Sequence, residues 1–369
     1  MKRLLLITTL LFVTLNAQEI NKDIHQFEIL NEIKTTSVKD QGSTGTCWAF
    51  ATTSFLETEL LRMGKGEFDL SEMFIVRKAY PLKADKYIRR HGTSNFSQGG
   101  QAHDVLMIYK NYGIIPEEFY GGNPVDGRHS HAELELVMKG MLDGVLVNNK
   151  ISNKWEKALN KTLDSYLGEI PQTFSVDNKE YSPKSFADEL GLNPDDYIEF
   201  TSYTNEPFYQ WVDLDIPDNW TNDKYFNVPI DDILSIMNNA LENGYSVCWD
   251  GDSGKDNFYR KEGYAVIPID DEPKLEERTE PEKEKDITQE MRQTAYNSFD
   301  VTDDHLMHIV GTAKNQIGTN FFYTKNSWGT KDKKFDGYWY MSEQYVKLKT
   351  VAIMVHKDAV PQKIMERIR

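Results

Sequence analysis

The stretch that decides the fold is CWAFATTSFLETELLRM, residues 47–63, together with the small-residue turn QGSTGT that precedes it at residues 41–46. Residues 47–63 contain no Gly or Pro, and their large apolar side chains recur at helical spacing. Gly64 follows directly, and a Gly just past the last turn is a common helix stop. The pattern therefore predicts a buried helix with Cys47 at its N-terminal end.

Outward from this helix, the chain changes from helical to strand-rich patterns. Helical patterns cover residues 70–80, 101–113, 131–165 and 229–244. Residues 170–225 are rich in Asp, Asn, Tyr and Pro and predict irregular structure. Strand-like runs follow, listed here with their first residues: YSVCWD (245), HLMHIVGTA (305), NFFYTKNSWG (320), GYWYMS (337) and VAIMVH (351). Helices first and strands last predict an α+β protein with two lobes.

Length and charge narrow the class of protein. A chain of 369 residues exceeds one small core and suggests two lobes or one large domain with insertions. Its 42 basic and 58 acidic residues give a net charge of -16, so nucleic acid is not expected as a partner. Only two cysteines, Cys47 and Cys248, exclude a disulfide-rich scaffold and a Cys-rich zinc module. We expect Cys248 to be a core residue.

The first residues, MKRLLLITTLLFVTLNAQ, resemble a secretory signal peptide. Lys2 and Arg3 give a positive start, residues 4–15 form an apolar run of signal-peptide length, and Ala17 suits a cleavage site. We therefore expect residues 1–17 to be removed, and the rest to be exported to a periplasm or secreted, with no integral membrane segment. The alternative is an uncleaved membrane anchor.

Three segments supply the groups of a thiol hydrolase. A helix N-terminus favours the thiolate of Cys47, and an imidazole can take its proton. His305, at the start of a strand-like run, is the candidate base, and Asn326 could orient its ring. Gln41, six residues before Cys47, could donate to a developing oxyanion beside the Cys47 backbone N–H. Trp328 could cover the His–Asn pair and exclude water.

These segments, QGSTGTCWAF (41–50), DHLMHIVG (304–311) and KNSWG (325–329), resemble the three active-site blocks of papain-like cysteine peptidases. SQGGQAHDVLMIYKNYGIIPEEFY (97–120) and PIDDILSIMNNALENGYSVCWDGDSGK (229–255) resemble the bleomycin hydrolase and aminopeptidase C branch of that family. The resemblance implies a two-lobe fold with a helical lobe, an antiparallel β lobe and a cleft between them.

The resemblance also implies roles by position. Cys47 is the nucleophile, His305 the general base and then acid, Asn326 the orienting residue and Gln41 the oxyanion donor. The remaining implied substrate-binding residues are Gly99 and Gly100, at a backbone edge near the scissile bond, and Leu306, lining a side-chain pocket.

The resemblance divides the chain into functional regions. The ranges are a signal peptide at 1–17, a helical lobe at 18–125, an insertion at 126–228 and a β-rich lobe at 229–369. No metal or organic cofactor is implied, the partner is a peptide or protein substrate, and a homo-oligomer is compatible with the sequence.

The implied function is that of an exported cysteine peptidase acting through a thioester, as an aminopeptidase C-like enzyme. The branch's aminopeptidases meet the substrate amine with their last residues, and the tail QKIMERIR (362–369) looks shorter than theirs. An endopeptidase of the same fold is therefore one alternative. The others are a catalytically silent peptide-binding protein on this scaffold and an enzyme that transfers the acyl group to an amine.

Overall fold

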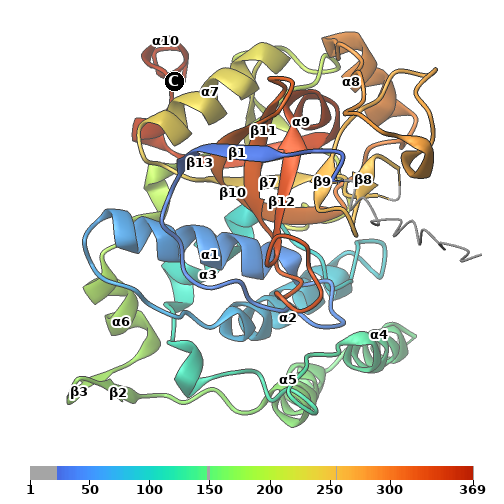
Figure 1. The fold of residues 1–369 in the computed structure, drawn as a ribbon. Coiled ribbons are helices and arrows are strands. Elements are labelled where there is room, and N and C mark those ends of the chain that lie inside the picture. The colour runs from blue at the N-terminus through green and yellow to red at the C-terminus, as the bar shows by residue number, and fades with distance from the viewer. Residues whose placement is uncertain (1–22, 148–149, 255, 369) are drawn as a thin grey trace, which may run out of the picture.

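The computed structural model describes residues 23–147, 150–254 and 256–368, and the predicted signal peptide lies outside them. Helices form one lobe and a large sheet forms the other (Figure 1). The helices of the first lobe are α1 (Cys47–Arg62), α2 (Glu72–Arg89), α3 (Ala102–Tyr112), α4 (Ala132–Leu146), α5 (Lys154–Leu167) and α6 (Pro183–Leu190). A small hairpin, β2 (Phe174–Val176) and β3 (Lys179–Tyr181), accompanies α6.

The second lobe is built on one mixed sheet with the strand order β5-β6-β4-β13-β7-β10-β11-β12-β9-β8, and β1 pairs with β10. Its strands are β1 (Phe27–Glu32), β4 (Tyr197–Thr201), β5 (Gln210–Asp213), β6 (Lys224–Asn227), β7 (Val247–Gly251), β8 (Phe258–Tyr259), β9 (Tyr264–Ala265), β10 (His305–Asn315), β11 (Asn320–Lys325), β12 (Tyr338–Ser342) and β13 (Thr350–His356). The helices of this lobe are α7 (Ile230–Glu242), α8 (Gln289–Asn297), α9 (Glu343–Lys349) and α10 (Gln362–Met365). Short 3-10 helices lie at Glu117–Phe119, Pro194–Asp196, Leu275–Glu277 and Lys357–Ala359.

Helix α1 lies where the two lobes meet, and its packing explains its sequence. All its residues from Cys47 to Leu60 are buried, because α2 and α3 cover one side and β7 and β10 the other. Successive side chains of a strand point to opposite faces of a sheet. Accordingly Leu306 of β10 joins the apolar cluster of the helical lobe, whereas its neighbour Met307 joins that of the sheet lobe. The α1–β10 contact fixes the N-terminal end of α1 against the start of β10.

The α+β class and the helix at 47–63 are confirmed, as are the helix from 230 and the strands β7 and β10–β13. The predicted helix at 70–80 is longer, since α2 continues through Pro81 to Arg89. The single helical pattern over 131–165 forms two helices, α4 and α5.

The prediction of irregular structure over 170–225 is wrong in part. This region contains α6, the hairpin of β2 and β3, the strands β4 and β5, and the start of β6; β4 pairs with β13. These strands are short and their apolar side chains follow no strict alternation, so the sequence pattern alone does not reveal them. The domain ranges stay a prediction, and the structure adds that the 126–228 range contributes strands to the main sheet.

Among the residues that the structure describes, no helix is both long and apolar enough to span a bilayer.

Candidate active site

Cys47 is the first residue of α1 and lies against the start of β10. The N-cap residue is Thr46, whose carbonyl accepts from the N–H of Ala49 at 2.9 Å. The backbone N–H of Leu306 donates to the sulfur of Cys47. The first N–H groups of a helix have no intrahelical acceptor, so the Cys47 side chain sits at the positive end of the helix dipole.

His305, the residue before Leu306, is buried and held by the segment after β11. Its Nε2 lies 2.8 Å from Oδ1 of Asn326. A carboxamide oxygen only accepts, so Nε2 carries a proton and donates, which leaves Nδ1 of a neutral ring as an acceptor. The indole of Trp328 stacks on the imidazole with the centroids 4.8 Å apart. The guanidinium of Arg260 covers that indole at 4.8 Å from the ring centroid. The imidazole is therefore fixed in both plane and tautomer.

Gln41 is clamped between the turn before α1 and the Asn326–Trp328 segment. Its Nε2 donates to the carbonyl of Thr44 at 2.7 Å, and its Oε1 accepts from Oγ of Ser327 at 2.6 Å. Ser327 also donates its backbone N–H to Oδ1 of Asn326 at 2.7 Å. Ser327 was missed by the sequence reasoning, although its place between Asn326 and Trp328 was a signal. It joins the predicted oxyanion donor to the predicted orienting residue.

Cys47 and His305, the predicted reacting groups, are each held in their neutral form when considered singly. Burial raises the pKa of the Cys47 thiol to about 12; the Leu306 N–H acts against this, and the carboxylates of Asp218, Asp250 and Asp304 add to it. Burial also lowers the pKa of His305, which its bond to Asn326 partly offsets. A charged thiolate is therefore stable here only with a compensating positive charge beside it.

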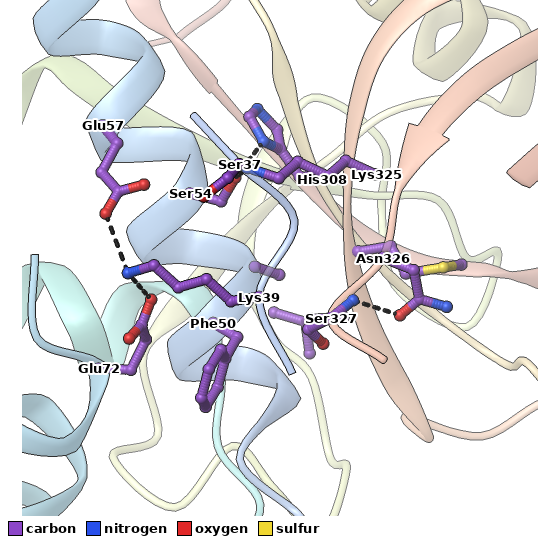
Figure 2. Close-up of a pocket in the computed structure, with 13 residues that line it drawn as sticks. Ser37, Lys39, Phe50, Ser54, Glu57, Glu72, His308, Lys325, Asn326 and Ser327 are labelled. Atoms are coloured by element: carbon purple, nitrogen blue, oxygen red, sulfur yellow. Dashed lines mark hydrogen bonds and ion pairs between the residues drawn. The ribbon is translucent and has the colours of Figure 1, made fainter. Parts of the chain in front are cut away.

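Behind this site, a buried polar network connects α1 to β10 and β11. Oγ of Ser54 lies 2.9 Å from Nδ1 of His308 and accepts from Nζ of Lys325 at 2.8 Å. Figure 2 shows this network, with Lys39 placed between Glu57 and Glu72 on its other side. Burial lowers the pKa of His308 well below its ordinary value. Asn326 therefore pairs with His305, and His308 belongs to the interface between the lobes.

The predicted substrate-binding glycines are closely packed and leave no room for a side chain. A Cβ on Gly100 would come within 2.9 Å of the Trp48 indole, and a Cβ on Gly99 would overlap the carboxylate of Asp218. Nζ of Lys83 donates to the carbonyl of Gly99. Asp218 comes from the loop after β5 and was not among the predicted site residues. The side chain of the third predicted binding residue, Leu306, is buried in the core cluster of the helical lobe, so the structure shows its backbone, and not its side chain, at Cys47.

The two cysteines are free and buried. Cys248 is a core residue, as expected, and its sulfur lies 3.5 Å from Oγ1 of Thr52. Within the described ranges, no group of three or more His, Cys, Asp or Glu side chains is arranged to hold a metal ion.

Comparisons with known proteins identify proteins that are similar to this chain. The model of the Peptidase C1-like family matches residues 75–369, which include His305 and Asn326. Aminopeptidase G of Lactobacillus delbrueckii subsp. lactis is 23% identical over 372 residues, covering 88% of this chain and 82% of the relative. Aminopeptidase C of Listeria monocytogenes is 22% identical over 394 residues, covering 91% and 83%. The crystal structure of PepW from Lactobacillus rhamnosis superposes with a TM-score of 0.75 at 18% identity, covering 92% of this chain and 84% of PepW. The sequence matches and the structural match to PepW extend over both lobes.

Proposed function

Because the chain belongs to the Peptidase C1-like family and is a cysteine-type peptidase of papain-like fold, we propose that it is an exported aminopeptidase with Cys47, His305 and Asn326 as its catalytic residues. The observation that carries the proposal is the contact between β10 and α1. The backbone N–H of Leu306 meets the sulfur of Cys47, and the adjacent His305 is bound to Asn326 at 2.8 Å. The aminopeptidase assignment is supported by the names of the relatives.

The proposed reaction has two steps. Nδ1 of His305 takes the Cys47 proton while the sulfur attacks the carbonyl carbon of the first peptide bond. The amide of Gln41 and the N–H of Cys47 bind the oxyanion. The imidazolium then gives its proton to the leaving amine, and a thioester remains. His305 next takes a proton from water, whose oxygen attacks the thioester, and the proton returns to the sulfur as the acid product leaves.

The deciding experiment is mass spectrometry of the products from matched peptides with free and acetylated N-termini. We expect single N-terminal residues to be released from the free peptides only. Internal cuts in both forms would instead identify an endopeptidase. The Cys47→Ala variant should bind peptides and release nothing. Wild-type protein that binds peptides without cutting them, and whose Cys47 resists a thiol-reactive epoxide, would identify a silent binding protein.

Export is proposed from the signal-peptide pattern of residues 1–17. N-terminal sequencing of the protein recovered from the periplasm or the medium tests this proposal. A mature chain that starts within a few residues of Gln18 supports it. Recovery of an uncleaved chain from the membrane fraction would favour an anchor, and recovery from the cytoplasm would contradict export.

A further inference from the structure

We propose that Asp218 binds the free α-ammonium group of the substrate and closes the substrate-binding edge at Gly99. This inference rests on the proposed aminopeptidase function. According to this inference, a carboxylate of the inserted region sets the distance between the N-terminus of the substrate and the scissile bond.

The first observation behind the proposal is the position of the Asp218 carboxylate beside Gly99. The carboxylate packs against Gly99 at the position that a Cβ would occupy, and it therefore lies beside the backbone segment at which we expect the substrate to bind. Several contacts fix it in this place. Its Oδ1 accepts from Nδ2 of Asn95 at 3.1 Å and from Oγ of Ser97 at 3.4 Å, and its backbone N–H donates to Oδ2 of Asp303 at 2.9 Å.

The second observation is the set of charged side chains around Asp218. Asp218, Asp250 and Asp303 lie close enough to interact electrostatically with one another. Burial, and to a smaller extent the charge of Asp218, raises the pKa of Asp303 to about 7. Lys83 is the cation that most offsets the charge of Asp218, and its Nζ already binds the carbonyls of Ser97 and Gly99. Burial and repulsion from other carboxylates raise the pKa of all three carboxyl groups, so a cationic ligand beside them would be stabilised by favouring their ionised forms.

A buried group with unused bonding capacity gives independent support. Both carboxylate oxygens of Asp250 are buried, and neither has a hydrogen-bond partner within standard geometry among the described residues. The side-chain amide of Gln101, the residue after Gly100, forms a hydrogen bond with Asp250 that falls outside this geometry and acts against the raised pKa of that carboxyl group. Asp250 is on β7 directly opposite Leu306, and its side chain points to the same face as Cys248, toward α1. An ammonium group and its water would satisfy these atoms.

The same charges connect amine binding to the chemistry. Asp218 and Asp250 help to raise the pKa of the Cys47 thiol, so the empty site disfavours the thiolate. A bound ammonium offsets that negative charge and favours the thiolate when a substrate with a free N-terminus is present. An acetylated peptide brings no such charge, so discrimination should affect kcat as well as KM.

The test measures two properties of Asp218→Asn. We expect kcat/KM for free peptides to fall about 10- to 100-fold, the usual range for a lost charge-assisted contact, so that the preference over acetylated peptides narrows. In contrast, alkylation of Cys47 by neutral iodoacetamide should become faster, because a charge that disfavours the thiolate is gone. A purely structural role for Asp218 would not produce this gain. Asp215→Asn, an exposed carboxylate of the same segment, is the matched control and should change neither property.

An unchanged preference for free N-termini in Asp218→Asn would overturn the inference and leave the aminopeptidase function intact. Internal cutting of acetylated peptides by the wild type would overturn the aminopeptidase function itself. If Asp218→Asn selectively lost the cleavage of acetylated peptides that have Lys at the cleavage site, Asp218 would be shown to bind a basic side chain. That result would also overturn the inference. If Asp218→Asn fails to fold, Asp218→Ser keeps a polar group near Asn95 and Ser97 and permits the same measurements.

Discussion

Cys47 is buried and interacts with nearby carboxylates, so under the proposed function its reactivity depends on proton transfer to His305. In His305→Ala the thiol loses its proton acceptor, and its pKa, which burial raises to about 12, then controls its reactivity. We expect the rate of Cys47 alkylation by iodoacetamide at pH 7 to fall by at least about 100-fold and to recover only in strongly alkaline solution. Rates measured from pH 5 to 11 test this. An unchanged profile would assign the activating base to another residue.

Ser327 binds the side chain of Gln41, the proposed oxyanion donor, and has no chemical step of its own in the proposed reaction. Ser327→Ala removes the donor to Oε1 of Gln41 and leaves a buried carboxamide oxygen without that bond, a loss of about 1–3 kcal/mol. Because the amide should then turn away from the oxyanion, we expect kcat to fall about 10-fold or more while the alkylation rate of Cys47 stays close to wild type. Equal losses in both measurements would point to general disruption of the site.

The residue scale also shows what the sequence could predict. Cys47, His305, Asn326 and Gln41 could be predicted as site residues because each belongs to a local motif, and the structure brings their segments together. Asp218 belongs to no motif and reaches Gly99 only through the folding of a long insertion. Local patterns carry no information about such a distant contact.

Helix α2 contains Pro81 in its interior, where proline removes a backbone donor and crowds the preceding turn. Pro81→Ala should therefore raise the free energy of unfolding by about 1–3 kcal/mol, as measured by urea denaturation. Pro183→Ala is the matched control, because Pro183 is the first residue of α6, where its missing N–H costs nothing. A gain in both variants, or in neither, would show that helix position is not the cause.

At the scale of elements, prediction succeeded where one strong pattern covered a whole segment. Helix α1 and the strand β10 are long, apolar and bounded by turns, so their type could be predicted. The strands β4 and β6 are short and owe their conformation to pairing with the sheet, β4 through the distant β13. The predicted helix ended at residue 80, before Pro81. Proline usually stops a helix, whereas here the surrounding packing maintains α2 through Pro81.

At the scale of the molecule, His103 of α3 joins the helical lobe to β4. Its Nδ1 lies 2.6 Å from Oε2 of Glu199. Burial alone lowers the pKa of His103, but Glu199 and Asp104 outweigh it and raise the pKa to about 9. The folded pKa exceeds the unfolded value of about 6.5, so the stabilisation is complete below pH 6.5 and is lost as the pH rises through about 9.

The His103→Gln variant measures this contribution. We expect its deficit in unfolding free energy relative to the wild type to be larger at pH 6 than at pH 9.5, by about 3 kcal/mol at most. Urea denaturation of both proteins at the two pH values provides the comparison. A deficit that does not change between them would show that His103 is not charged in the folded protein.

The pairing of β1 with β10 has a consequence for how the chain acquires its fold. Phe27 lies opposite Asn315, so a strand near the start of the described chain finds its partner almost three hundred residues later (Figure 1). The segment between β1 and α1 then leads from the sheet lobe into the helical lobe. During synthesis, β1 must therefore stay unpaired until β10 has emerged, and contacts so distant in sequence form slowly. The sheet lobe is therefore completed only after translation has passed β10 and the strands that follow it.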